Sequence, residues 1–370
     1  MIRFAAALRG VGLVIVAALL LSACAPSAPD GSDAAPAGDT RPLSQITPLA
    51  DPASFEGPST AVIDGARIEP VVEEPDQHLP ATVLSRDLDG DREVTVDDAS
   101  RVIAMDLSGS LAATVWGLGL GDSLVGRDIS TTFPGTEELP VVTSSGHTVN
   151  AEAIIAEAPT LVLTDGSIGP TDVVAQLRDV GITVVFVEQV ASFDGAADLA
   201  RQVAEALGAG EAGRMLAERI ASDVDETLAQ IEALAPADPA ERLRMVFLYL
   251  RGTAGVYYLF GEESGADELI EGLGGVDVAG ELGWDGMQPL TDEAMVAADP
   301  DLILVMTDGL ASVGGVDGLL ADKPAIALTT AGRHHRIVDM ADGQILSFGP
   351  RSAEVLTALA RAVYAPEGGA

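Results

Sequence analysis

The residues best suited to chemistry are a tyrosine and an arginine at the end of one apolar segment. Arg244 to Gly252 reads Arg-Met-Val-Phe-Leu-Tyr-Leu-Arg-Gly, and the alternation of a strand places Tyr249 and Arg251 on the same face. A neighbouring cation stabilises a phenolate, and phenolate oxygen is a known ligand of ferric iron. Because the chain has only four tyrosines, Tyr249 is a candidate iron ligand. The alternative is a core tyrosine with a satisfied hydroxyl.

A histidine occupies a comparable position earlier in the chain. The apolar segment Leu139–Thr143 reads as a strand, and Ser-Ser-Gly-His147 follows it as a loop before Asn150, a good helix N-cap. Ligands of open α/β sheets bind at the carboxyl ends of the strands. We therefore expect His147 and Tyr249 to face each other across a cleft between two lobes. A loop histidine that bonds the backbone remains the alternative.

An internal repeat predicts those two lobes. The segment Glu152–Gly166 matches Glu293–Gly309 at an offset of 141 residues, which Pro159 and Pro300 share. Each copy reads as a short helix, a proline stop, an apolar strand and an Asp-Gly turn. The fold class expected is α/β, with two similar Rossmann-like lobes and a ligand cleft between them.

One long helix is expected between the copies. From about Gly210 to Ala235, apolar residues recur at steps of three and four, which forms a single stripe on a helix roughly 40 Å long. Such a spine predicts small closure motions between the lobes. We assign residues 81–192 to an N-terminal lobe, 193–240 to a linker with the spine helix, and 241–366 to a C-terminal lobe.

The N-terminal region carries an export signal. Arg3 and Arg9 precede an apolar run from Val11 to Leu21, which is too short to span a bilayer and is typical of a signal peptide. The next residues, Leu-Ser-Ala-Cys24, resemble the lipobox of bacterial lipoproteins. The resemblance implies that residues 1–23 are removed and that Cys24, the only cysteine, is lipidated at the extracytoplasmic face of the cell membrane.

Composition restricts the remaining possibilities. Residues 24–80 are rich in Ala, Pro, Asp, Gly and Ser without periodicity, so we expect a disordered tether. The net charge of −37 argues against a nucleic-acid partner, because phosphates are neutralised by Lys and Arg clusters. Nucleophile-elbow, P-loop and zinc-protease motifs are missing from the sequence, which favours a binding protein over an enzyme.

The chain resembles the substrate-binding lipoproteins of bacterial ABC importers that serve haem, siderophores and cobalamin. The similarity covers roughly residues 80–365. The combination of Gly146-His147-Thr148, Phe247-Leu-Tyr249-Leu-Arg251-Gly252 and Leu346-Ser-Phe-Gly-Pro-Arg351 resembles the haemin-binding proteins of actinobacterial haem uptake.

The resemblance implies a set of roles. His147 and Tyr249 would be the axial ligands of ferric haem b, carried as a transported ligand, and Arg251 would hydrogen-bond the Tyr249 oxygen. Arg351 and Arg127 are candidate contacts for the haem propionates.

Partners are implied in the same way. A permease and an ATPase of a haem importer would receive the ligand, with Asp172 and Glu293 as candidate docking residues, and haem-donor proteins at the cell surface would supply it. The alternatives are a ferric-siderophore or cobalamin carrier and, more remotely, a surface-anchored hydrolase that uses His147.

Overall fold

The computed structural model describes residues 41–63, 67–144, 147–170 and 172–366. The expected signal peptide, Cys24 and the start of the expected tether lie outside these residues. No helix in the described ranges is long and apolar enough to cross a membrane.

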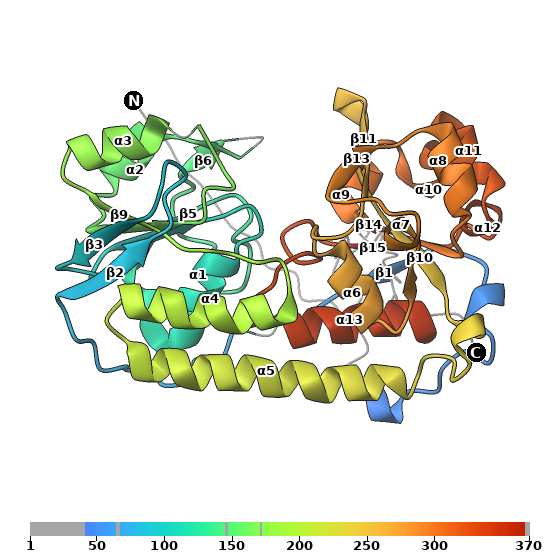
Figure 1. Ribbon diagram of the computed structural model, residues 1–370, viewed down its shortest axis with the longest axis horizontal. Helices are drawn as coiled ribbons and strands as arrows, with labels where there is room; N and C mark the ends of the chain where they lie inside the picture. The colour runs from blue at the N-terminus through green and yellow to red at the C-terminus, as the bar shows by residue number, and fades with distance from the viewer. Residues whose placement is uncertain (1–40, 64–66, 145–146, 171, 367–370) are drawn as a thin grey trace, which may run out of the picture. The chain divides into compact units, whose positions relative to one another are not determined.

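The N-terminal lobe is built on a parallel sheet in the order β5-β4-β8-β9; its strands β5 and β9 are labelled in Figure 1. Its strands are continuous apolar runs because helices cover both faces. Two antiparallel hairpins, β2–β3 and β6–β7, lie outside the sheet. The strands of this lobe are β2 Ala81–Ser85, β3 Arg92–Val96, β4 Val102–Met105, β5 Leu124–Arg127, β6 Thr143–Ser144, β7 Thr148–Val149, β8 Leu161–Thr164 and β9 Thr183–Phe186.

The C-terminal lobe has a larger, mixed sheet in the order β1-β15-β14-β10-β11-β13, with β12 also pairing with β10. The strands β1, β15, β14 and β10 are parallel, whereas β11 and β13 are added antiparallel. The strands are β1 Ser59–Ala61, β10 Arg244–Arg251, β11 Val256–Phe260, β12 Val276–Asp277, β13 Met287–Pro289, β14 Leu302–Met306 and β15 Ile337–Met340.

Helices connect the strands of both lobes. In the N-terminal lobe they are α1 Ser110–Val115, α2 Ala151–Ala156, α3 Asp172–Asp179 and α4 Phe193–Ala206. In the C-terminal lobe they are α6 Ala266–Gly272, α7 Val278–Glu281, α8 Asp292–Ala298, α9 Thr307–Ala311, α10 Gly315–Asp322, α11 Pro324–Leu328, α12 Thr330–Arg333 and α13 Ser352–Tyr364. The helix α1 ends at Val115 and continues as a π-type turn, Trp116–Leu120, in which Gly119 has φ +88°.

The expected spine helix is α5, Gly210–Glu232 (Figure 1). It packs against α4 in one lobe and α13 in the other. Leu216 and Ile220 are buried in the core of the N-terminal lobe, whereas Val224 and Ile231 are buried in the core of the C-terminal lobe. One apolar stripe therefore contributes to both cores. The helix α4 also packs into the N-terminal core, so residues 193–206 are part of that lobe rather than of a linker.

The two repeated segments fold alike up to their ends. The first gives α2 and β8, and the second gives α8 and β14. Asn150 and Thr291 cap the two helices by accepting hydrogen bonds from Ala153 and Ala294. The second Asp-Gly pair differs from the expectation, because Asp308 and Gly309 lie inside the short helix α9 instead of a turn.

The expected tether does not extend to residue 80, because residues 41–63 pack on the C-terminal lobe. The strand β1 pairs with β15, Leu43 and Ile46 are buried in the C-terminal core, and residues 67–80 continue onto the N-terminal lobe, where Ile68 is buried. We call residues 41–63 the strap. Because the strap has no periodic pattern, the sequence did not reveal its contacts with the C-terminal lobe.

Arg336 connects the strap to the C-terminal lobe. Its side chain is 1% exposed, stacks on Phe55 at 4.7 Å and donates to Ser59 Oγ at 2.9 Å. It also donates to the backbone carbonyls of Ala362 and Val363, at 3.0 and 2.7 Å. The guanidinium thereby supplies a donor to the Val363 carbonyl and a second donor to the Ala362 carbonyl, which also accepts from Ser59 Oγ.

Replacing Arg336 should destabilise the protein. The substitution Arg336→Met keeps the apolar bulk but removes the donor to the Val363 carbonyl and one of the two donors to the Ala362 carbonyl, and we expect a loss of about 2–3 kcal/mol in the free energy of unfolding. Urea denaturation followed by circular dichroism measures it. The matched control is Arg333→Met, since the nearby Arg333 is exposed and should change stability little. Equal effects of both variants would contradict the role given to Arg336.

Candidate functional site

Tyr249 lies in the last part of β10, on the strand face predicted from alternation. Met245, Phe247 and Tyr249 contact one core cluster, whereas Val246, Leu248 and Leu250 belong to the cluster on the other face. The Tyr249 ring stacks on Phe260, with centroids 5.8 Å apart and planes at 20°. Aromatic packing therefore fixes the orientation of this ring.

The Tyr249 hydroxyl distinguishes this residue from two other tyrosines. Tyr257 donates to Asp322, and Tyr364 donates to the carbonyl of Leu273. Among the described residues, no hydrogen-bond partner of the Tyr249 hydroxyl is present. Its oxygen is thus available to a ligand, which is not the arrangement of a core tyrosine with a satisfied hydroxyl.

Arg251 stands over the face of the Tyr249 ring. Its guanidinium carbon is 4.7 Å from the ring centroid, and its Nη2 donates to Asp342 Oδ2 at 2.6 Å. Its Nη1 donates to the carbonyl of Leu250 at 2.9 Å. The pairing with Tyr249 is therefore a cation–π contact here, whereas the resemblance implied a hydrogen bond to the tyrosine oxygen.

His147 lies in the short loop that joins β6 to β7. Thr148 and Ser144 pair across this hairpin, and His147 has φ +58°. The left-handed region is sparsely populated by residues other than glycine, and such positions cluster at functional sites. Ser145 and Gly146, which belong to the same sequence motif, lie outside the described residues.

The imidazole of His147 is partly buried. Its Nδ1 is buried and has no hydrogen-bond partner among the described residues. Burial lowers the pKa of His147, whereas Asp128 and Asp342 raise this pKa and Arg251 lowers it. The net result favours the neutral ring, which is the form that binds iron. Arg251 and Asp342 belong to the C-terminal lobe, so charges of that lobe act on His147.

Two exposed apolar residues that the sequence analysis did not single out lie at the carboxyl edge of the N-terminal sheet. Leu107 follows β4 and is 52% exposed, and Ile129 follows β5 and is 42% exposed. Ser130 Oγ donates to the carbonyl of Leu107 at 2.7 Å, which holds the two loops together. An apolar side chain directly after a parallel strand is the signal that could have identified them, because ligands bind at that edge.

Two buried carboxylates, Asp106 and Asp128, fix the backbone of these loops by accepting hydrogen bonds. The Asp106 carboxylate accepts the backbone N–H groups of Ser108, Ser110 and Leu111, and Asp128 accepts those of Asp106 and Thr131. Burial, with the nearby charges of Asp128 and Asp165, raises the pKa of Asp106 to about 7. Burial also raises the pKa of Asp128.

The candidate propionate contacts are engaged elsewhere. Arg127 Nη1 donates to the carbonyls of Asp128 and Thr131, at 3.3 and 2.9 Å. Arg351 is buried, and its Nε donates to Glu354 at 2.8 Å. Arg127 is half-buried. The candidate docking residues Asp172 and Glu293 are exposed in the first turns of α3 and α8.

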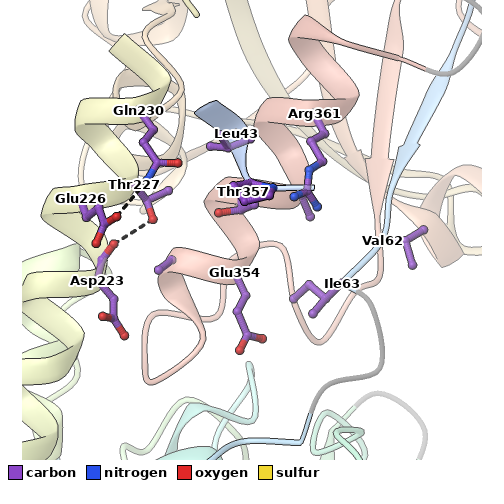
Figure 2. A pocket seen from close by; sticks show the side chains of 13 residues that line it. Leu43, Val62, Ile63, Asp223, Glu226, Thr227, Gln230, Glu354, Thr357 and Arg361 are labelled. Carbon is purple, nitrogen blue, oxygen red and sulfur yellow. Dashed lines mark hydrogen bonds between the residues drawn. The ribbon is translucent and has the colours of Figure 1, made fainter. Parts of the chain in front are cut away.

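A cavity of about 830 Å³ lies away from these residues, between α5, α13 and the strap. Figure 2 shows Asp223, Glu226 and Glu354 around it, with Arg361 on α13. Gln230 donates to Glu226, and Thr227 donates to the carbonyl of Asp223. The cavity contains neither His147 nor Tyr249, so it is separate from the candidate site.

The raised pKa of Asp106 predicts how stability changes with pH. The folded state holds this proton more tightly than the unfolded state, so the contribution to stability is present below about pH 4 and is lost as pH rises through about 7. We expect urea denaturation to show stability falling from pH 5 to pH 8, and Asp106→Asn to flatten that slope. The control is the exposed Asp198→Asn. A slope unchanged in Asp106→Asn would contradict this source of pH dependence.

Comparisons with known proteins identify the family of this chain. Residues 106–342 match the family model described as periplasmic binding protein. The haem-binding protein HmuT has a solved structure that is 42% identical, with a TM-score of 0.79 and coverage of 85% of this chain and 99% of that chain. Further structures of HmuT carry alanine in place of a histidine, a tyrosine, and an arginine two residues beyond that tyrosine.

Curated relatives are more distant. The uncharacterized ABC transporter substrate-binding lipoprotein YvrC of Bacillus subtilis is 29% identical over 73% of this chain and 85% of its own length. A cobalamin-binding protein of Halobacterium salinarum is 27% identical over 73% of this chain and 71% of its own length. With the family model covering more than half of the sequence, the chain belongs to the periplasmic binding protein family, the substrate-binding proteins of ABC transporters.

Proposed function

We propose that this protein captures ferric haem between its lobes and delivers it to an ABC permease for haem and iron uptake. Two observations carry the proposal: the Tyr249 hydroxyl has no hydrogen-bond partner among the described residues, and burial favours the neutral imidazole of His147. The variants of HmuT at a histidine, a tyrosine and an arginine support it, because Arg251 also stands two residues beyond Tyr249.

The donor set suits iron that is already held by a porphyrin. Among the residues described, no group of three or more His, Cys, Asp or Glu side chains could hold a bare metal ion. A porphyrin supplies its own equatorial nitrogens, so one tyrosine and one histidine are sufficient as axial ligands. The exposed Leu107 and Ile129 would cover an apolar macrocycle, because a ligand pocket is lined mainly by apolar side chains.

The chemistry favours capture of the ferric state. A bound Fe³⁺ favours the phenolate form of a tyrosine ligand. An anionic oxygen ligand stabilises Fe³⁺, while neutral His147 supplies a nitrogen ligand on the other side. The ligand would be bound and released as haemin b without redox turnover.

Haemin titration tests this proposal. We expect the purified protein to give a Soret band that saturates at one haem per chain. Tyr249→Phe should raise the Kd at least tenfold, about 1.4 kcal/mol, and His147→Ala should shift the ferric spectrum. The matched control is Tyr258→Phe, because Tyr258 lies directly across from Tyr249 on β11 and should leave the spectrum unchanged.

Cobalamin is the second candidate ligand, favoured by the relative from Halobacterium salinarum. Isothermal titration with cyanocobalamin and with a ferric siderophore, in parallel with haemin, separates these possibilities. Saturable binding of either compound without haemin binding would overturn the haem proposal. The Tyr249–Arg251 pair favours haem, because cobalamin carries no ferric iron that would select a phenolate.

We also propose attachment to the membrane and docking on a permease. Cys24 would carry the lipid, and the exposed carboxylates of Asp172 and Glu293, one on each lobe, would meet basic pockets of the transporter. The described residues contain no membrane-spanning helix, so attachment would depend on the acyl chains, at about 0.8 kcal/mol per buried methylene.

Removal of the acylation site tests this attachment. In cells that produce Cys24→Ser, we expect the protein to leave the membrane fraction, while Ser22→Ala at the same motif should leave it there. Fractionation followed by immunoblotting measures the difference. Retention of Cys24→Ser in the membrane fraction would contradict lipid anchoring at this residue.

A further inference from the structure

We propose that Asp342 is a positioning residue for haem ligation, which holds the Arg251 guanidinium against the ring of Tyr249. This inference rests on the proposed haem function and assigns a role to a residue 91 positions away from Arg251 in sequence. Asp342 lies just beyond β15, at the carboxyl edge of the sheet that also carries the end of β10.

Both carboxylate oxygens of Asp342 are engaged, so its position is fixed. Oδ2 accepts from Arg251 Nη2 at 2.6 Å, and Oδ1 accepts from the backbone N–H of Asp308 at 2.9 Å. Asp308 lies in the first turn of α9, where N–H groups have no partner within the helix. A carboxylate held between an N–H group and a guanidinium imposes one direction on the arginine.

The space for the guanidinium depends on Gly309. A Cβ atom at this position would lie 3.0 Å from Arg251 Nη1 and 2.8 Å from the carbonyl oxygen of Leu250. That carbonyl accepts the hydrogen bond from Nη1. The Asp-Gly pair at the end of the repeated segment therefore has a local purpose, since Asp308 binds Asp342 and Gly309 leaves room for Arg251.

The ion pair is sheltered enough to hold its geometry. The side chains of Arg251 and Asp342 are 31% and 22% exposed, less than those of Arg244 and Glu281, at 40% and 49%. A free arginine side chain has several rotatable bonds and samples many rotamers. Without Asp342 the guanidinium would sample solvent and leave the Tyr249 ring.

A double-mutant cycle on the full-length protein tests the inference. We expect Asp342→Ala to raise the haemin Kd about threefold to thirtyfold, a range set by typical couplings between contacting residues. Its ferric spectrum should shift toward that of Arg251→Ala. In the Arg251→Ala background, Asp342→Ala should have no further effect on either the Kd or the spectrum.

Glu281→Ala is the matched control, because Glu281 pairs with Arg244 at the opposite end of the same strand at 2.6 Å. It should leave the spectrum unchanged. Asp342→Asn keeps an oxygen for the Asp308 N–H and serves as a second, milder variant, with a smaller spectral shift in the same direction.

Two results would overturn the inference. The first is additivity of the Asp342 and Arg251 substitutions. The second is a lowered melting temperature in Asp342→Ala with a wild-type haemin spectrum, which would indicate a purely structural role. Absence of haemin binding by the wild-type protein would instead be a failure of the proposed function, so the two failures are distinguishable.

Discussion

The arrangement of the site depends on the burial of one helix in two cores. Leu216 and Ile220 of α5 are buried in the N-terminal lobe, and Val224 and Ile231 in the C-terminal lobe. A helix is stiff along its axis, and core packing resists small displacements, so each lobe is fixed relative to the same rod. His147 and Tyr249 come from different lobes, and the site proposed for them would therefore depend on this shared apolar stripe.

Most of the correct predictions from the sequence came from local periodicity. The alternation in Arg244–Arg251 predicted which face of β10 holds Tyr249, and the three-and-four spacing predicted α5. These signals are reliable because a buried strand or helix face must repeat with the backbone. The fold class was confirmed by the structure and by the family match.

Contacts between distant segments could not be inferred in this way. The strap depends on Arg336, which lies 277 residues beyond Ser59, and the orientation of Arg251 depends on Asp342. Neither pairing produces a periodic pattern in the sequence, because each involves one polar side chain. The cation–π geometry of Arg251 over Tyr249 likewise required the positions of both side chains, since spacing alone is compatible with a hydrogen bond to the hydroxyl.

The strap changes the geometry available at the membrane. A tether from Cys24 to residue 80 would contain 57 residues and reach at most about 200 Å, whereas the strap leaves the 17 residues from Cys24 to Thr40, with a maximum of about 60 Å. If Cys24 carries the proposed lipid, residue 41 would stay within about 60 Å of the bilayer, because 17 residues cannot span more. The search for a permease would then be nearly two-dimensional, confined to a thin layer above the membrane.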